Sequence, residues 1–317
     1  MSSRVIQFDI DQWQAWAPGL ASADDWAIWA RDPCDPSGSD AQPDVSFLPS
    51  MQRRRLSRLA RMVFAVAAPL AAGQPAMPLV YASRHGETAR TFAILNDLAS
   101  DEPLSPTQFS LSVHNAIIGL WSIQQNDPSE MTALAAEGDG LEHAVLEASL
   151  LLGEGAPAVL VVIAEDQTPA VYAPWISDVS FPYAVALLLK PGSTWQLSLE
   201  AADGHEALTQ RPHAIELIGA LLNEQPTFQH RWGDAVGTGS RLVEQQAQRS
   251  LAVAPGRDRA VIRPVRSRWA LPAVGRLSVA WPAARRCCHT PSPGSSDGEP
   301  AVLAVRSVHV SQRRADL

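Results

Sequence analysis

The chain has 317 residues, of which 46% are hydrophobic and 18% are charged, a composition that excludes wholesale disorder and supplies a sizeable apolar core. Residues 251–317 carry eleven Arg, no Lys and four acids, a net charge of +7, so the first 250 residues carry −15. Because nucleic-acid binding needs clustered positive charge, so acidic a body argues against a nucleic-acid partner.

Two apolar stretches, residues 62–72 and 156–164, are each too short to cross a bilayer, which requires about 20 apolar residues. The first residues mix charged and apolar positions and lack the apolar region of a secretion signal. We therefore expect a cytoplasmic protein without a membrane span. The cysteines, Cys34 and the adjacent Cys287 and Cys288, match neither a disulfide framework nor a metal-binding motif.

Four tryptophans lie within the first 35 residues, in two pairs. Within each pair the spacing is three residues, which places both side chains on one face of a helix. Large aromatic side chains at this density usually anchor a segment to a core or to a partner. The pairs Trp13/Trp16 and Trp26/Trp29 therefore predict two helical anchors, followed by a Pro-, Ser- and Asp-rich loop over residues 32–44.

Helices and short strands alternate along the middle of the chain. Apolar residues spaced i, i+3, i+4 and i+7 predict a helix over residues 52–72, which Gly73 ends. Residues 77–83 are predicted to form a short buried strand. A helix over residues 87–99 follows, and its apolar positions, which include Leu95, share one stripe.

The next segments continue this alternation. Residues 112–124 carry an apolar helical stripe, and residues 131–136 are predicted to form a strand. Asp139 and Glu142 have the spacing of a capping box at the start of the following helix. The continuous apolar run over residues 158–164 is typical of a strand whose sheet is covered on both faces.

Two further strands, over residues 183–189 and 195–200, are separated by the turn-forming residues 190–193 and predict a hairpin. A last helix is expected over residues 211–222. The glycine-rich stretch 233–240 lacks the lysine of a P-loop and is expected to be a linker. Because strands alternate with helices, the predicted fold class is α/β, a layered domain with a mostly parallel sheet.

The composition changes after about residue 245, and the last 67 residues contain seven Pro and eleven Arg without hydrophobic periodicity. We therefore divide the chain into a domain over residues 1–245 and an irregular Arg- and Pro-rich tail over residues 246–317. Three interpretations of the tail are open. It is a basic disordered segment, a translation of GC-rich DNA in the wrong frame, or, as the least favoured option, a small folded domain.

One cluster consists of residue types that bind metal ions, namely Glu137, Asp139, Glu142 and His143. Acids at a helix N-terminus, however, also cap free N–H groups and stabilise the helix dipole. We favour this second interpretation, and we expect neither a metal nor a cofactor.

A second group, Ser112, His114 and Asn115, is polar within an otherwise apolar helix. A serine–histidine nucleophile is conceivable there. Residues two apart do not face each other on a helix, however, which favours a buried structural His–Asn pair. Residues 83–86, Ser-Arg-His-Gly, follow a strand at a place where α/β sheets bind ligands, but they also fit a strand-to-helix turn that requires Gly86.

Several strings together resemble a known family. They are Trp13-x-x-Trp16 with Ala17-Pro18-Gly19, Arg53-Arg54-Arg55-Leu56-Ser57-Arg58, Ala82-Ser83-Arg84-His85-Gly86-Glu87, and Leu104-Ser105-Pro106-Thr107-x-Phe109-Ser110-x-Ser112-Val113-His114-Asn115-Ala116-x-x-Gly119. Over about residues 3–240 the chain is similar to short β-ketoacyl-synthase-like proteins that correspond to the N-terminal half of a ketosynthase. Those proteins resemble chain length factors and occur in bacterial aryl-polyene and related pigment clusters.

This resemblance implies a thiolase-like half fold of order βαβαβαββ, in which the strand over residues 131–136 lies beside its equivalent across a dimer. A condensing ketosynthase carries its nucleophilic Cys directly after this strand, where the helix N-terminus lowers the thiol pKa. Here the turn contains Ala136, Glu137 and Gly138, with neither Cys nor Ser. The half of the fold that supplies two decarboxylating histidines is also missing. Candidates for a tunnel wall or a subunit interface are Ser112, His114, Asn115, Met131 and Thr132.

The leading hypothesis is a non-catalytic subunit that forms a heterodimer with a full-length β-ketoacyl synthase. It would shape the acyl tunnel during fatty-acid or polyketide-type elongation and meet the acyl carrier protein through the complex. The alternatives are a stand-alone thioester hydrolase or acyltransferase that uses Ser and His residues, and a damaged product without function. Because half of a thiolase fold leaves one face uncovered, we also expect the isolated chain to self-associate.

Overall fold

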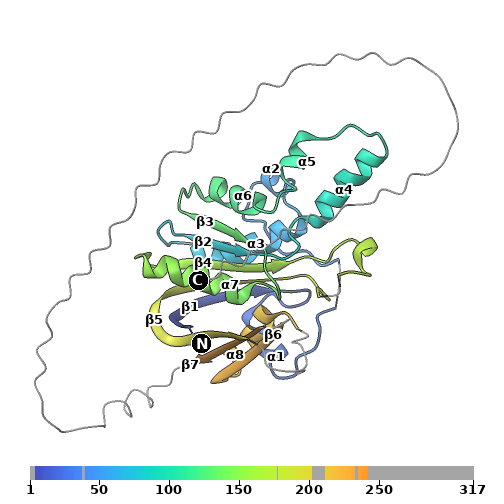
Figure 1. Ribbon diagram of the computed structural model, residues 1–317. Coiled ribbons are helices and arrows are strands. Elements are labelled where there is room, and N and C mark those ends of the chain that lie inside the picture. Colours follow the sequence, from blue (N-terminus) through green and yellow to red (C-terminus); the bar gives the residue numbers. More distant parts are fainter. Residues whose placement is uncertain (1–3, 38–39, 177, 202–210, 233–234, 242–317) are drawn as a thin grey trace, which may run out of the picture. The chain divides into compact units, whose positions relative to one another are not determined.

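A computed structural model of the chain describes residues 4–37, 40–176, 178–201, 211–232 and 235–241 (Figure 1). The Arg- and Pro-rich tail over residues 246–317 lies outside the described residues, as does the proposed domain boundary at residue 245. The division into a domain and a tail therefore stays a prediction.

The strands are β1 (Arg4–Trp16), β2 (Leu79–Ala82), β3 (Met131–Leu134), β4 (Val159–Glu165), β5 (Tyr183–Ala201), β6 (Thr227–Trp232) and β7 (Ala235–Arg241). In the described residues they form one sheet in the order β3-β2-β4-β5-β7-β6, and β1 pairs with β5. Strands β3, β2 and β4 are parallel, as the alternation of strands and helices predicts. Strands β5, β1, β7 and β6 add antiparallel pairs. The predicted α/β class and thiolase-like half fold are confirmed.

The α-helices are α1 (Ala23–Trp29), α2 (Ser50–Arg53), α3 (Arg58–Ala71), α4 (Thr88–Ala99), α5 (Pro106–Ser110), α6 (Ala116–Gln125), α7 (Leu141–Gly153) and α8 (His213–Leu222). The single helix predicted over residues 52–72 is two helices, because the hydroxyl of Ser57 accepts the N–H of Ala60 and caps α3. Among the described residues, no helix combines the length and the apolar character that a membrane crossing requires.

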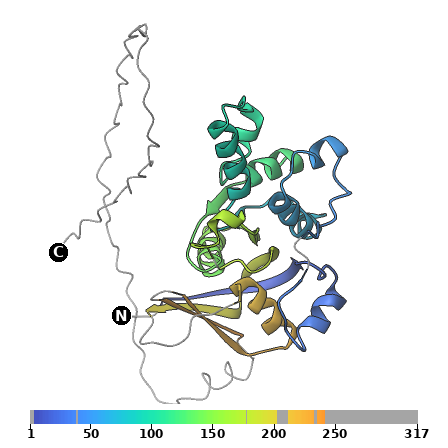
Figure 2. The same cartoon turned by 90° about the vertical axis from the view of Figure 1, so that its right-hand side faces the viewer.

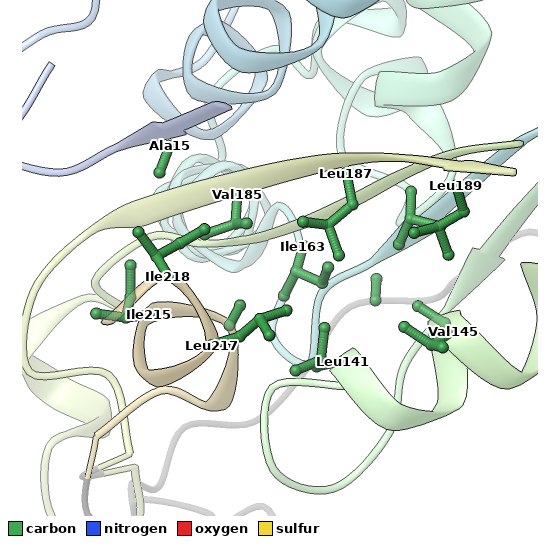
Figure 3. Packing of buried hydrophobic residues seen from close by; sticks show 14 of the residues in the cluster. Ala15, Leu141, Val145, Ile163, Val185, Leu187, Leu189, Ile215, Leu217 and Ile218 are labelled. Atoms are coloured by element: carbon green, nitrogen blue, oxygen red, sulfur yellow. The ribbon is translucent and has the colours of Figure 1, made fainter. Parts of the chain in front are cut away.

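Alternating residues of β4 and β5 bury side chains on both faces of the sheet. Ile163 and Leu187 belong to the cluster that includes α7, α8 and α1. Val162 belongs to the opposite cluster, which includes α3 and α6. Figure 3 shows Ile163 and Leu187 beside Leu141 of α7 and Leu217 of α8. Every residue of β4 is buried, which confirms the strand predicted from the apolar run over residues 158–164.

Helices α1 and α8 close the face of the sheet that carries α7. Trp26 and Trp29 of α1 join the same buried cluster as Ile215 and Ile218 of α8. The rings of the two tryptophans meet edge to face, with centroids 5.3 Å apart, so this predicted helical pair is confirmed. Helices α1 and α8 thus cover part of this face, and the expected self-association of the isolated chain stays a prediction.

The first tryptophan pair lies in strand β1, so its helical prediction is wrong. Side chains alternate along a strand, and a spacing of three therefore places two residues on opposite faces. Trp16 is buried in the cluster beside α3, and Trp13 packs against the cluster beside α7. Two apolar residues spaced three apart therefore fit a helix with one buried face, but they fit a strand with two buried faces equally well.

Strand β5 continues through the segment predicted to turn, so the hairpin prediction is wrong. Lys190 lies opposite Asp9 of β1, and Trp195 lies opposite Phe8, so residues 191–194 bulge out of the ladder. The carboxylate of Asp9 accepts the N–H of Thr194 at 2.8 Å and holds the bulge in place. Pairing with the distant strand β1 thus decides the path of the Pro-Gly segment.

The glycine-rich stretch near residue 240 is strand β7, which pairs with both β5 and β6. Gly239 lies opposite Phe228. A Cβ at Gly239 would overlap the Phe228 ring, so the absence of a side chain makes room for this aromatic residue. The linker prediction is therefore wrong over residues 235–240, and residues 233–234 lie outside the described residues.

Candidate functional site

The turn between β3 and α7 occupies the position where the resemblance places a nucleophile. Glu137 is exposed in this turn, and Ala136 is half-buried. Gly138 and Gly140 have φ values of +68° and +79°, in the left-handed region that favours glycine. A Cβ at Gly138 would lie 2.8 Å from Cε1 of His213, so the turn rests directly on the imidazole ring.

Asp139 ties this turn to α8 and β5. Its carboxylate accepts the N–H of Leu141 at 3.1 Å, the N–H of Ala214 at 2.8 Å and the hydroxyl of Tyr183 at 3.3 Å. Gly140 is the residue that precedes α7, so the predicted capping box with Asp139 as its first residue is wrong. Burial raises the pKa of the Asp139 carboxyl.

Glu142 lies in the first turn of α7 and binds two imidazoles rather than the backbone. Its carboxylate lies 3.0 Å from Nδ1 of His213 and 2.7 Å from Nδ1 of His230. Burial raises the pKa of Glu142, but the two hydrogen bonds outweigh it and hold that pKa at about 2. Burial lowers the pKa of His213, but its bond to Glu142 and the nearby charge of Asp139 raise it overall. The result is a buried cluster of alternating acids and imidazoles directly beneath the turn.

Sequence reasoning considered Glu142 but missed both of its partners. His213 and His230 lie 71 and 88 residues further along the chain, at the first position of α8 and within β6. His143, the residue that the sequence groups with Glu142, is not part of the cluster of metal-ligating side chains formed by Glu142, His213 and His230 in the described residues.

Ser112, His114 and Asn115 precede α6, so they are not inside a helix as predicted. The hydroxyl of Ser112 donates to the carbonyl of Phe109 at 2.9 Å. Nε2 of His114 lies 2.7 Å from the carbonyl of Ser83, at the end of β2, and Asn115 is exposed. The predicted buried His–Asn pair is therefore wrong, and Ser112 and His114 each contact a different backbone carbonyl.

Ser83 and His85 bind different carboxylates at the carboxyl ends of β2 and β4. The hydroxyl of Ser83 lies 3.2 Å from Glu165, and Nε2 of His85 lies 3.0 Å from Asp178. Glu165 also accepts the backbone N–H groups of Arg84 and His85. A serine activated by histidine requires the two side chains within hydrogen-bond reach, and these contacts instead form a structural turn.

We expect the stability of the wild type, relative to a Glu165→Gln variant, to fall as the pH rises. Burial raises the pKa of Glu165 from 4.5 to about 7, so between these values the folded chain holds a proton that the unfolded chain has lost. The contribution of protonated Glu165 to the free energy of unfolding is fully present below pH 4.5. It is lost as the pH rises through 7, a change of about 3 kcal/mol. Urea unfolding of both proteins at pH 5 and pH 8 measures this difference, and a constant difference would contradict it.

Strand β3 lies at the edge of the sheet, and in the described residues its outer side has no strand partner. All four of its residues are half-buried. The hydroxyl of Thr132 lies 3.3 Å from a carboxylate oxygen of Glu147 in α7, and Met131 packs against the cluster beside α3. An edge strand of this kind presents free N–H and C=O groups to a partner strand.

The segment that precedes this edge strand in the sequence, from α4 to α6, carries exposed apolar side chains. No residue of α4 or α5 is buried, and both helices extend away from the sheet (Figures 1 and 2). The stripe predicted on the helix over residues 87–99 is thus only partly covered, because Leu95 is exposed while the ring of Phe92 packs edge to face against Tyr172. Exposed large apolar residues of this segment, here called the α4–α6 surface, are Leu95, Leu98, Leu104, Phe109, Val113 and Ile123. Where such exposed apolar side chains form a contiguous patch, they mark an interaction site.

Comparison with known proteins identifies relatives of this arrangement. The family profile described as "Beta-ketoacyl synthase, N-terminal domain" matches residues 26–236. One chain of the ketosynthase ApeO in complex with its chain length factor ApeC, from Xenorhabdus doucetiae, is 29% identical with a TM-score of 0.68, and the match covers 74% of this chain and 100% of that chain.

A second solved structure shares the fold at low identity. It is AntDE:AntF, a type II PKS acyl-carrier protein in complex with its ketosynthase bound to the hexaketide. One of its chains has a TM-score of 0.53 at 10% identity, and the match covers 76% of this chain and 100% of that chain. A search of curated proteins found no match.

The matched residues include the turn between β3 and α7, the α4–α6 surface and the buried cluster around Glu142. They span more than half of the chain, and the structural likeness leads to the same thiolase-like ketosynthase fold. The chain therefore belongs to the β-ketoacyl synthase N-terminal domain family.

Proposed function

We propose that this chain is a chain-length-factor-like subunit that pairs with a full-length β-ketoacyl synthase and does not itself catalyse condensation. The observation that carries the proposal is Glu137, an exposed carboxylate in the turn where a condensing enzyme holds its thiol. A carboxylate cannot form the acyl thioester through which a thiolate nucleophile works. The turn has left-handed Gly138 and Gly140, and it contains neither Cys nor Ser.

Two features support pairing. The outer side of β3 offers a strand edge, and the α4–α6 surface offers exposed apolar side chains that the described part of the chain leaves uncovered. The relative with 29% identity is a chain from a complex between a ketosynthase and its chain length factor. We assign both features to one interface with the ketosynthase, formed by β3 and the α4–α6 surface.

The proposed role is to shape the tunnel that holds the growing acyl chain in polyketide-type elongation, of the aryl-polyene class, with the acyl chain delivered on a carrier protein to the complex. Ser112 and His114 then serve as supports for the segment before α6, not as a nucleophile and its base. Their separate bonds to backbone carbonyls argue against the alternative of a stand-alone hydrolase or acyltransferase.

The first test is co-expression with the ketosynthase encoded by a neighbouring gene, followed by affinity capture on a tag carried by this chain alone. We expect a complex of one copy of each chain, together with elongation activity that neither purified chain shows alone. Failure of the two chains to co-purify would refute the proposed pairing. Hydrolysis of acyl thioesters by the isolated chain, lost in a His114→Ala variant, would favour the alternative.

Glu137→Cys should not give condensation by this chain alone, because a thiol without its base and oxyanion contacts is not an active site. Glu137→Leu should change pairing or product length, because it places an apolar side chain on a turn that follows the interface strand. Elongation assays and product analysis with the partner ketosynthase measure both effects. Condensation by Glu137→Cys without a partner would overturn the non-catalytic assignment, and wild-type behaviour of Glu137→Leu would remove this turn from the interface.

A further inference from the structure

Glu142, His213 and His230 each offer one metal-ligating atom, and these atoms lie within 4.8 Å of one another. The three side chains come from α7, α8 and β6, and their exposed fractions are 1%, 4% and 1%. Two imidazoles and one carboxylate form a donor set that suits Zn²⁺ and related divalent transition metals. We propose that this cluster is a structural site for a divalent transition metal ion, with Zn²⁺ as the expected ion.

The orientation of the two rings favours a shared ion. Both imidazoles turn the same atom, Nδ1, toward the carboxylate of Glu142, at 3.0 and 2.7 Å. The rings are stacked with centroids 4.4 Å apart and an angle of 23° between their planes. A single ion beside the Glu142 carboxylate would therefore face Nδ1 of both rings.

The second nitrogen of His230 supplies an independent observation. Nε2 is buried and has no hydrogen-bond partner in the described part of the chain, but it lies 3.6 Å from a carboxylate oxygen of Glu216. If the single proton of a neutral His230 ring were on Nδ1, Nε2 would be a buried hydrogen-bond acceptor that faces the Glu216 carboxylate, which is also an acceptor. If Nδ1 binds a metal, Nε2 carries the proton and faces an acceptor. Metal-binding histidines usually direct their other N–H to a carboxylate in this way.

Asp139 lies on the His213 side of the cluster, with an oxygen 4.0 Å from Nδ1 of that ring. A fourth donor at this place would complete a closed, tetrahedral set of the kind that structural zinc sites use. The ion would then join the first turn of α7 to α8 and β6, directly beneath Gly138. This site is independent of the proposed function, because its role is to hold these three elements together whether or not the chain pairs with a ketosynthase.

The test uses the full chain, expressed with added ZnCl₂ and purified on a tag without histidines and without chelators. We expect about one zinc per chain by elemental analysis, and refolding with CoCl₂ should give the visible absorption of tetrahedral Co²⁺. Refolding with Zn²⁺ instead of EDTA should raise the thermal midpoint by about 5–10 °C. Less than about a tenth of an equivalent of metal per chain, together with an unchanged thermal midpoint, would contradict the metal site. The cluster would then be held by hydrogen bonds between the imidazoles and Glu142.

His230→Gln is the first variant, since glutamine keeps a hydrogen-bond donor but is a poor zinc ligand. It should lose the bound metal and the response of the midpoint to Zn²⁺. His114→Gln is the matched control, because its ring contacts a backbone carbonyl outside the cluster and the metal content should not change. Full metal content in His230→Gln would contradict the assignment. If His230→Gln does not fold, the Co²⁺ spectrum and the Zn²⁺-dependent midpoint of the wild type decide the question.

Discussion

A double variant that carries Leu98→Asp and Phe109→Asp should bind the partner ketosynthase about 100-fold or more weakly than the wild type. These side chains are 57% and 65% exposed in this chain, so their replacement leaves the core intact. Burial of one Leu or Phe side chain contributes about 1.5–3 kcal/mol, and 1.4 kcal/mol corresponds to a tenfold change in Kd. A charge buried at the same place adds a desolvation cost.

The matched control for this double variant is Ile28→Asp. Ile28 is 68% exposed, but it lies on α1, which packs with α8 on the face of the sheet that carries α7. We expect Ile28→Asp to bind the ketosynthase as the wild type does. Isothermal titration calorimetry gives Kd for both variants, after circular dichroism has verified that each one is folded. An unchanged Kd for the double variant would exclude the α4–α6 surface from the interface.

The partly exposed apolar stripe on α4 illustrates what the sequence could predict. The spacing of its apolar residues predicts a helix with an apolar stripe, and the helix Thr88–Ala99 is present. Spacing does not tell what covers that stripe, because the covering surface can belong to another chain. By contrast, β4 is correctly predicted as buried on both faces, because a continuous apolar run has no polar face to expose.

Long-range pairing accounts for the hairpin error. Residues 190–193 have the composition of a turn, but β1, far away in the chain, pairs with β5 on both sides of this segment and keeps it in one strand. The candidate site follows the same rule. The resemblance points to the turn at Glu137, whose residues are consecutive, whereas His213 and His230 come from elements that only the fold brings to Glu142.

Trp26→Ala should destabilise the chain by about 3–5 kcal/mol, the range for an aromatic residue removed from a core. Trp26 is 1% exposed, and its indole N–H donates to the carbonyl of Ala15 at 3.0 Å. Its ring also packs edge to face against Trp29. Trp26 therefore joins α1 to β1 and to the helices that close the sheet. Urea unfolding followed by circular dichroism measures the loss.

Two companion variants separate the causes. Trp26→Phe keeps a large ring but leaves the Ala15 carbonyl without its donor, so we expect a smaller loss of about 1–3 kcal/mol. Trp175→Ala removes a tryptophan that is 78% exposed and should change stability by less than about 0.5 kcal/mol.

The size of the Trp26 effect tests whether this half fold is self-sufficient. The resemblance to half of a thiolase fold implies a face that a second half would cover, and here α1 and α8 pack on the face of the sheet that carries α7. If α1 and α8 stabilise this face as a second half would, Trp26→Ala should lower the free energy of unfolding by the same amount in the isolated chain and in the complex. A loss that appears only in the isolated chain would mean that the ketosynthase, and not α1, holds this face closed in the complex.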